Sequence, residues 1–413
     1  MVRYELKKVF SSVGGKIALM LYIAVLVLSC WLSATGATNI TVKWVNEQGE
    51  SEYGPAAVQY LRDAQVEWEG WVNQDTLTRM IQENQRINAS PEANSDDVQQ
   101  LNIAYGWKQG FAPIRDMANH SYAEGFRKYN YYTADKMTSI DEDAFYANRE
   151  KQLKRWLYDE TDAGYSMYSE PEKQYLIEQY RQLQAPYYFT YYEGWHQLLE
   201  NSGYITSLGM LILGFLLAGI FSNEFKWKAD AVYFSTLCGR TQATSAKVKA
   251  GFLLVTALYW GAMLLYSLFT LSYLGFGGAS CVIQWEIWKS IYNINMWQAW
   301  LLVVVSGYIG NLFLAFLTMW ISAKTQSAVF AVTTPFILVF LPSFLDGMPG
   351  WLGKISGLMP SHLLEAYQNL GSFRILTVSG NVLRMLDVCI VLYLALSILL
   401  VPLMYREYRR KRL

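Results

Sequence analysis

The sequence predicts an all-α membrane protein with six transmembrane helices, an interfacial helix at the N-terminus and a mainly helical extracellular domain inserted after the first span. Apolar residues make up 53% of the chain and charged residues only 16%, well below the quarter or so found in soluble proteins. Six apolar runs approach or reach the roughly 20 residues that a helix needs to cross a membrane. The charge is also divided, because residues 37–200 carry 15 Lys and Arg against 26 Asp and Glu, while the whole chain is neutral.

The first 16 residues form an amphipathic pattern ahead of the first apolar run. One face of a helix built from this segment is apolar, and basic side chains lie opposite. The apolar face consists of Val2, Leu6, Val9, Phe10 and Val13. We therefore expect residues 1–16 to lie as an interfacial helix on the inner leaflet, with Gly14 and Gly15 as the bend into the membrane.

An alternative interpretation of the same segment is a cleaved signal. A basic start, an apolar run and Ala34-Thr35-Gly36 have the order of a signal peptide, and residues 27–30 weakly resemble a lipoprotein site. The long, patterned stretch before the apolar run favours the interfacial helix instead.

The six apolar runs are the predicted transmembrane helices. They cover residues 17–32, 204–221, 251–273, 300–321, 328–345 and 388–405. Trp and Tyr at their ends are typical of side chains at the level of the lipid headgroups. With its flank, the first span extends over residues 17–37, and spans two to six occupy residues 202–413.

The basic residues of the short loops predict the orientation. Lys and Arg are frequent before span one, in residues 222–249, between spans four and five, and after span six. The loops on the other side contain fewer, among them Lys289, Lys354 and Arg374. Because basic loops stay in the cytoplasm, both termini are predicted to be cytoplasmic. The sequence therefore predicts a multi-pass protein of the cell membrane, with residues 38–201 outside the cell.

The acidic segment at residues 38–201 combines helix-forming stretches with clusters of tyrosine. The helical patterns cover residues 55–71, 75–88, 141–159 and 171–183. The clustered rings are those of Tyr129, Tyr131, Tyr132, Tyr187, Tyr188, Tyr191 and Tyr192. Aromatic rings give a large amphipathic contact area, so they fit either the core of a folded domain or a surface that captures a peptide or an amphiphile.

Motifs of catalysis and metal binding are missing from the sequence. His120, His196 and His362 stand alone, without a second metal ligand at helical spacing. No nucleophile elbow occurs, and the glycines at residues 14–15 lack the flanking residues of a phosphate-binding loop. We therefore predict no catalytic residue, no metal site and no nucleotide site in this chain, and no nucleic-acid partner.

The loop between spans two and three, residues 222–249, carries the strongest functional signal. Glu224 directly follows span two, and residues 225–237 have the length and pattern of a short amphipathic helix. Trp227 and Phe234 are expected to share one face of that helix. A short amphipathic helix in a cytoplasmic loop can transmit force from a partner to the two spans attached at its ends.

Here the chain resembles the permease subunits of ABC-2 type transporters. In that family a glutamate after the second span precedes a coupling helix, and an arginine and then a lysine follow. Glu224, Arg240 and Lys247 have this order and spacing. The N-terminal helix, the six spans and an extracellular re-entrant segment at residues 346–382 also fit. The loop departs from the family pattern just after the glutamate and just before the arginine, and the resemblance does not reach the acidic segment.

The resemblance implies a transmembrane subunit of an ATP-driven exporter, which is not itself an enzyme. Separate ATP-binding subunits would dock on the loop and would hold the ATP and Mg²⁺, so this chain would bind no cofactor. The residues implied in coupling are Glu224, Phe225, Trp227, Tyr233, Phe234, Leu237, Arg240 and Lys247. A second copy or a related permease would complete a path across the lipid membrane for a hydrophobic or peptide-like cargo. The alternative is a membrane sensor or assembly factor whose Tyr-rich domain binds an external ligand.

Overall fold

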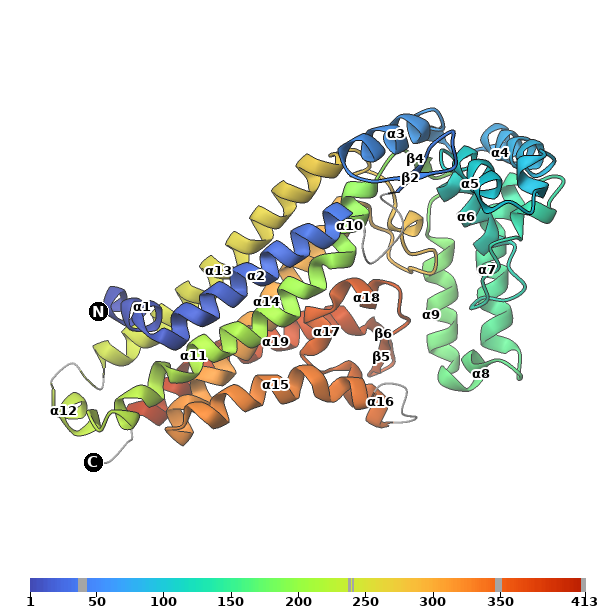
Figure 1. Ribbon diagram of the computed structural model, residues 1–413. Helices are drawn as coiled ribbons and strands as arrows, with labels where there is room; N and C mark the ends of the chain where they lie inside the picture. The colour runs from blue at the N-terminus through green and yellow to red at the C-terminus, as the bar shows by residue number, and fades with distance from the viewer. Residues whose placement is uncertain (36–42, 237–238, 240, 346–350, 410–413) are drawn as a thin grey trace.

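The computed structural model describes residues 1–35, 43–236, 239, 241–345 and 351–409, and it is mostly helical (Figure 1). Six of its helices are long and apolar enough to cross a membrane, which confirms that part of the predicted fold class. They are α2 (Val13–Thr35), the helix Glu193–Lys226 that ends in α11 (Gly209–Lys226), α13 (Gln242–Leu274), α14 (Met296–Thr325), α15 (Ala328–Leu345) and α19 (Met385–Arg409). Six such helices are compatible with a multi-pass membrane protein.

The bundle has a buried centre and a more exposed periphery. In α14, 72% of the most apolar stretch is buried, and in the helix Glu193–Lys226 the value is 67%. In the other four spans it lies between 22% and 33%. Two central helices are thus covered by protein, whereas the outer four leave apolar side chains uncovered, as helices that face lipid do. α14 is the hub, since it packs against α11, α13, α15 and α19.

α1 (Val2–Ser11) precedes the first long helix and packs against α2 and α13. The break between α1 and α2 falls at Ser12, whose backbone is extended, so the bend precedes Gly14 and Gly15. The Ser12 hydroxyl oxygen accepts a hydrogen bond from the Gly15 amide at 2.9 Å. This bond satisfies a donor at the start of α2, which explains why the bend falls at a serine. The location of α1 at a membrane surface stays a prediction.

The second span begins earlier than the sequence predicts. α10 (Glu193–Gly203), the π-helical turn η4 (Tyr204–Leu208) and α11 form one continuous helix of 34 residues. Residues 193–201, which the sequence places in the external domain, therefore belong to this helix. At the π turn, the hydroxyl group of Thr206 donates to the Leu364 carbonyl at 2.5 Å, and the Asn311 amide donates to the Thr206 carbonyl at 3.1 Å.

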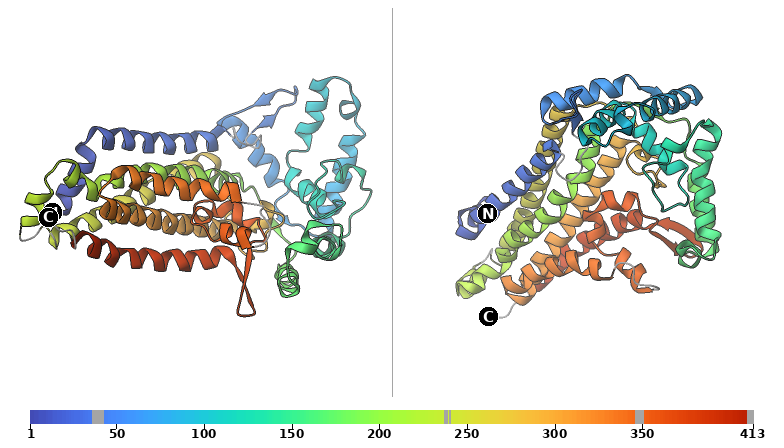
Figure 2. Two further views of the ribbon diagram at one scale, coloured as in Figure 1. Left: turned by 90° about the horizontal axis from the view of Figure 1, so that it is seen from below. Right: turned by 45° about the vertical axis from the view of Figure 1, so that its right-hand side comes forward.

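Residues 43–192, called the inserted segment below, lie at the end of the bundle opposite to α1 and to α12 (Asp230–Ser235) (Figures 1 and 2). The helices and turns of the inserted segment are α3 (Pro55–Val66), α4 (Gln74–Asn88), η2 (Glu92–Asn94), α5 (Val98–Trp107), α6 (Ala112–Ser121), η3 (Ala134–Lys136), α7 (Glu142–Tyr158), α8 (Ala163–Met167) and α9 (Glu170–Arg181). Two short antiparallel pairs are present, β1 (Trp44–Val45) with β2 (Ser51–Glu52) and β3 (Gly70–Trp71) with β4 (Tyr188–Phe189). Helices thus occupy most of each of the four stretches that carry a helical pattern, but α3 ends at Val66 and the end of the first stretch forms β3.

The tyrosines of the inserted segment divide between its core and its surface. Tyr187 and Tyr191 are buried. Tyr129, Tyr131 and Tyr132 are exposed. Each of the two interpretations of the aromatic clusters therefore fits a different part of the segment.

Short elements between α15 and α19 complete the end of the bundle that faces the inserted segment. They are α16 (Trp351–Gly357), α17 (Ser361–Leu364), α18 (Ala366–Leu370) and a hairpin of β5 (Ile375–Val378) and β6 (Asn381–Arg384). α17 and α18 pack against α14. Of the predicted re-entrant segment at residues 346–382, residues 346–350 lie outside the described part, and entry into a membrane stays a prediction.

Hydrogen bonds fix the inserted segment to the bundle. The loop between α13 and α14 contains η5 (Ile283–Trp285), and the Trp285 indole donates to the Tyr188 carbonyl at 2.9 Å. The Tyr168 hydroxyl donates to the Phe373 carbonyl at 3.2 Å. Contacts on two sides therefore hold the segment in place.

Candidate functional site

The connection between α11 and α13 folds as two pieces instead of one helix over residues 225–237. α11 runs past the apolar stretch and ends at Lys226. Lys228 then adopts a left-handed backbone conformation with φ of 55°, and α12 begins at Asp230. Because a non-glycine residue with positive φ cannot continue a right-handed helix, α12 is a separate helix of six residues.

The side chains of this connection divide into an exposed and a buried group. Trp227 is 57% exposed and Val232 is 71% exposed. Phe234 is only 6% exposed, and Phe225 and Tyr233 are half-buried. Trp227 and Phe234 therefore do not share one face, because the helix is interrupted between them.

Tyr408, near the end of α19, lies at the centre of an aromatic cluster. Its ring centroid lies 4.8 Å from that of Phe221, 5.1 Å from Phe234, 6.1 Å from Tyr233 and 6.3 Å from Phe225. Aromatic rings at these separations pack favourably in tilted and edge-to-face arrangements. The cluster therefore attaches α12 both to α11 and to the last span.

Lys247, in the second turn of α13, is the centre of a buried ion cluster. Its side chain is 1% exposed, and its Nζ lies 2.7 Å from Glu224 Oε1 and 3.3 Å from Glu5 Oε2. The same ammonium group donates to the Ile220 carbonyl at 2.6 Å. Lys8 Nζ lies 3.2 Å from Glu5 Oε1 and 3.2 Å from Glu224 Oε1. Two ammonium groups and two carboxylates thus form a neutral cluster, which joins α1, α11 and α13.

Mutual pairing is what permits these charges inside the protein. An isolated buried charge is very costly, and only good pairing and hydrogen bonding offset that cost. Burial lowers the pKa of Lys8, but Glu224 and Glu5 together raise it by more, so the pKa of this lysine lies above its usual value. Loss of one member of the cluster would leave an opposite charge buried without its partner.

Glu5 and Lys8 are the members of the cluster that sequence reasoning missed. Glu224 and Lys247, both predicted, meet directly, whereas Glu5 is 242 residues away from Lys247 in the chain. One feature of the sequence could have indicated that Glu5 is paired, because it is the only acidic residue before Glu47. On an otherwise basic helix, a lone carboxylate that is buried must face a cation of the protein.

The apolar face predicted for the N-terminal helix also contacts protein. Val2, Leu6 and Val9 pack against the core of the bundle. Phe10 and Val13 are exposed. The face predicted to enter the membrane therefore covers the bundle over most of α1, and only its last residues stay available to lipid.

Two of the predicted coupling residues, Leu237 and Arg240, lie outside the described residues, so their role stays a prediction. Gly239 between them is described, and its amide donates to the Thr236 carbonyl at 3.2 Å. A Cβ atom at Gly239 would lie 1.9 Å from the Tyr233 carbonyl oxygen. Only glycine fits this turn.

Comparison with known proteins identifies no family for this chain. No protein-family model, no curated protein and no solved structure matches it. The resemblance to ABC-2 permeases therefore rests on the order of Glu224, Arg240 and Lys247 and on the arrangement of the helices.

Proposed function

We propose that the chain is the transmembrane permease subunit of an ABC transporter, which moves a hydrophobic or peptide-like substrate with ATP hydrolysed by separate subunits. The proposal is supported above all by the ion cluster of Lys247, Glu224, Glu5 and Lys8. The cluster joins three helices where the chain leaves the bundle to form α12. A partner that displaces α12 would therefore displace α1, α11 and α13 together.

Trp227 and Val232 are the residues proposed to contact the ATP-binding subunit. Both are exposed in the connection that carries α12. A large exposed aromatic side chain beside an aliphatic one is typical of an anchor that fills a pocket on a partner. Phe234 would not touch the partner, because it is buried against Tyr408, and it would instead pass the displacement on to α19.

A complete transporter would need a second permease, either another copy of this chain or a related one. One chain supplies six candidate spans, and its four peripheral spans leave most of their apolar surface uncovered. Lipid and the second permease would cover that surface in the cell membrane. ATP and Mg²⁺ would be bound in the partner subunits, on the cytoplasmic side with both termini of this chain.

Co-purification tests the proposal. The tagged full-length chain, extracted from its native membranes in a mild detergent, should carry an ATP-binding subunit with it. Trp227→Ala should lower the recovery of that subunit at least tenfold, because a buried aromatic anchor is worth 2 kcal/mol or more, on the order of a thirtyfold change in affinity. Phe276→Ala is the matched control, since Phe276 is 60% exposed but lies in the loop at the other end of the bundle. Recovery of the chain without any ATP-binding subunit would contradict the proposal.

Glu224→Gln separates coupling from docking. The variant removes one charge of the ion cluster but leaves Trp227 and Val232 unchanged. We expect the ATP-binding subunit to stay bound, while transport by the reconstituted complex is lost. Transport at the wild-type rate would show that the cluster transmits no force.

The second candidate function is a membrane sensor or assembly factor. It is favoured by a cavity between the inserted segment and the bundle, which would hold an external ligand without any ATPase. Ligand binding at this cavity by a chain that recovers no ATP-binding subunit would favour the sensor over the transporter.

A further inference from the structure

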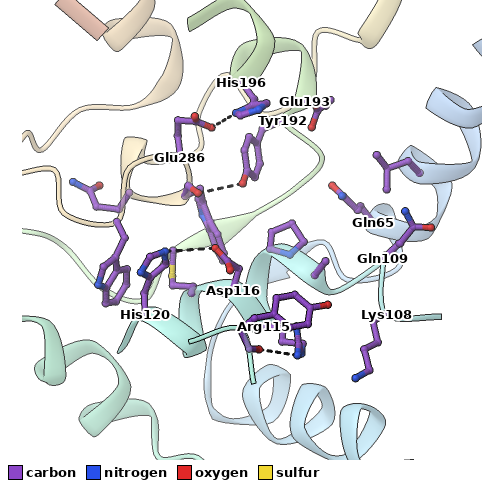
Figure 3. Close-up of a pocket in the computed structure, with 18 of the residues that line it drawn as sticks. Gln65, Lys108, Gln109, Arg115, Asp116, His120, Tyr192, Glu193, His196 and Glu286 are labelled. Carbon is purple, nitrogen blue, oxygen red and sulfur yellow. Dashed lines mark hydrogen bonds and ion pairs between the residues drawn. The ribbon is translucent and has the colours of Figure 1, made fainter. Parts of the chain in front are cut away.

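A cavity of about 540 Å³ lies between the inserted segment and the bundle (Figure 3). α3, α5 and α6 line one side, and the start of α10 and the loop between α13 and α14 line the other. The volume lies within the range of roughly 300 to 1,000 Å³ that is usual for small-molecule sites. Aromatic rings contribute to the lining, among them those of Tyr105, Tyr192 and Trp285.

One of the acidic residues in the lining is already paired inside the protein. The Glu286 carboxylate is hydrogen-bonded to His196 Nδ1, as Figure 3 shows, and accepts a second hydrogen bond from the Tyr367 hydroxyl. Burial raises the pKa of Glu286, but His196 and Tyr367 lower it by more, so its pKa lies below the usual value. Glu286 is therefore ionised at neutral pH, and its charge is engaged by protein groups.

Glu193 and Asp116 are two further carboxylates of the lining. In the part of the chain that the structure describes, neither forms an ion pair with a lysine or an arginine, and Glu193 accepts a hydrogen bond from the Gln197 amide at 2.8 Å. Asp116 accepts one from the Tyr129 hydroxyl and lies 3.6 Å from His120 Nε2. Burial lowers the pKa of His120 by more than Asp116 raises it, so this histidine is neutral at pH 7. Neither carboxylate is thus held by a lysine or an arginine among the described residues, although Glu193 also lies near His196 and the Asp116 side chain is 50% exposed.

The lysine and the arginine of the lining, in contrast, are held by one carboxylate of the inserted segment. Arg115 is buried and donates to Asp135 Oδ2 at 2.9 Å and to the Tyr131 carbonyl at 2.9 Å. Lys108 Nζ lies 3.4 Å from Asp135 Oδ1. An anionic ligand would have to compete with Asp135 for these cations.

We propose that the cavity binds a small organic cation, such as a protonated amine, attracted by the carboxylates of Glu193 and Asp116 and packed against the aromatic rings. Carboxylates form strong charge-assisted hydrogen bonds with ammonium groups, and ring faces add to the attraction of a cation. The buried indole N–H of Trp288, which also lines the cavity, has no acceptor among the described residues. An oxygen atom on the ligand would satisfy it, so the ligand is a cation that also carries a hydroxyl or carbonyl group. The inference holds for a transporter and for a sensor alike.

Calorimetry on the purified full-length protein in detergent tests this binding with three matched probes. Tyramine and phloretate carry an ammonium and a carboxylate group, respectively, at the end of a two-carbon chain on a phenol ring, and para-ethylphenol has the same ring and chain without a charged group. Tyramine should bind at least tenfold more tightly than either of the others, because a hydrogen bond to a charged group is worth about 1.5 kcal/mol or more. Equal affinity for tyramine and phloretate, or no binding of tyramine, would overturn the proposal.

Substitutions locate the site. Glu193→Gln and Asp116→Asn should each weaken tyramine binding about tenfold and leave para-ethylphenol unaffected. Glu124→Gln is the control, since Glu124 is an exposed carboxylate that does not line the cavity. Unchanged tyramine affinity in both cavity variants would show that the amine binds elsewhere. The measurement uses no ATP-binding subunit, so its failure and a failure of the proposed transport function are distinguishable.

Discussion

Two regions of this molecule contain clusters of ionisable groups, and they differ in how these groups are paired. In the ion cluster near α12, Lys247 and Lys8 each lie within 3.3 Å of two carboxylates. In the cavity beneath the inserted segment, the buried Glu193 and the half-exposed Asp116 form no ion pair with a lysine or an arginine among the described residues. A buried charge without a partner costs free energy, so the ion pairs of the first region stabilise one arrangement of its helices. In the second region, the carboxylates can still form an ion pair with a bound ligand.

The comparison predicts its largest effect at Lys247. Lys247→Met leaves the two buried carboxylates with only the partly exposed Lys8 as a cation, so it should lower the free energy of unfolding by about 3–5 kcal/mol. Lys249→Met is the matched control, since Lys249 lies two residues further along α13 but is exposed, and it should change the stability by less than about 0.5 kcal/mol. Thermal unfolding in detergent, followed by tryptophan fluorescence, measures both. If Lys247→Met and Lys249→Met changed the stability by similar amounts, the pairing of Lys247 would not stabilise the fold, and the difference between the two regions would not hold.

Adding Glu224→Gln to Lys247→Met refines that result. The second substitution removes one of the two carboxylates that lose Lys247 as a partner. The double variant should therefore lose less free energy of unfolding than the two single losses added together. A double-mutant cycle measures this coupling. Strict additivity would mean that the two side chains do not interact in the folded protein.

The next prediction compares a buried and an exposed side chain of the connection that carries α12. Phe234→Ala empties a buried position against Tyr408 and should lower the free energy of unfolding by about 3 kcal/mol. Trp227→Ala truncates an exposed side chain and should change it by less than about 0.5 kcal/mol, even though it removes the proposed partner contact. Chemical denaturation of the purified chain, without any partner, compares the two. Equal losses would argue against the assignment of Trp227 to docking.

A smaller effect is expected at Lys8, the outer member of the ion cluster. Its side chain is 42% exposed, so solvent screens its two ion pairs. Lys8→Met should therefore lower the free energy of unfolding by roughly 0.2–1 kcal/mol, and added salt should reduce the difference from wild type. A loss as large as that of Lys247→Met would show that the cluster is less accessible to solvent than its exposure indicates.

The smallest effect is expected in the cavity. Glu193→Gln removes a carboxylate that forms no ion pair with a lysine or an arginine among the described residues, so it should change the free energy of unfolding by less than about 0.5 kcal/mol. The same denaturation measurement applies. A large loss of stability would mean that Glu193 has a structural role like that of Glu224, and the contrast between the regions would no longer hold.

The fold was predictable where the signal is local. Each of the six long helices contains an apolar run, and the length of that run can be read directly from the residues. The start of the second span was not predictable, because α10 contains polar residues. These residues bond within the helix, as where the Asn201 amide donates to Gln197 Oε1 at 3.0 Å. Polar side chains that hydrogen-bond to one another can be buried in a helix. The sequence of such a helix then lacks the apolar pattern from which a span is predicted.

The sequence by itself thus determined the number of long apolar helices, and it singled out Glu224 and Lys247 without indicating that they pair. The tertiary structure decided which residues complete each region. Glu5 reaches Lys247 across 242 residues, and the cavity is formed by side chains from five separate parts of the chain. The physical reason is that helix formation and apolar length depend on neighbouring residues, whereas the pairing of a buried charge depends on which distant segment the packing places beside it.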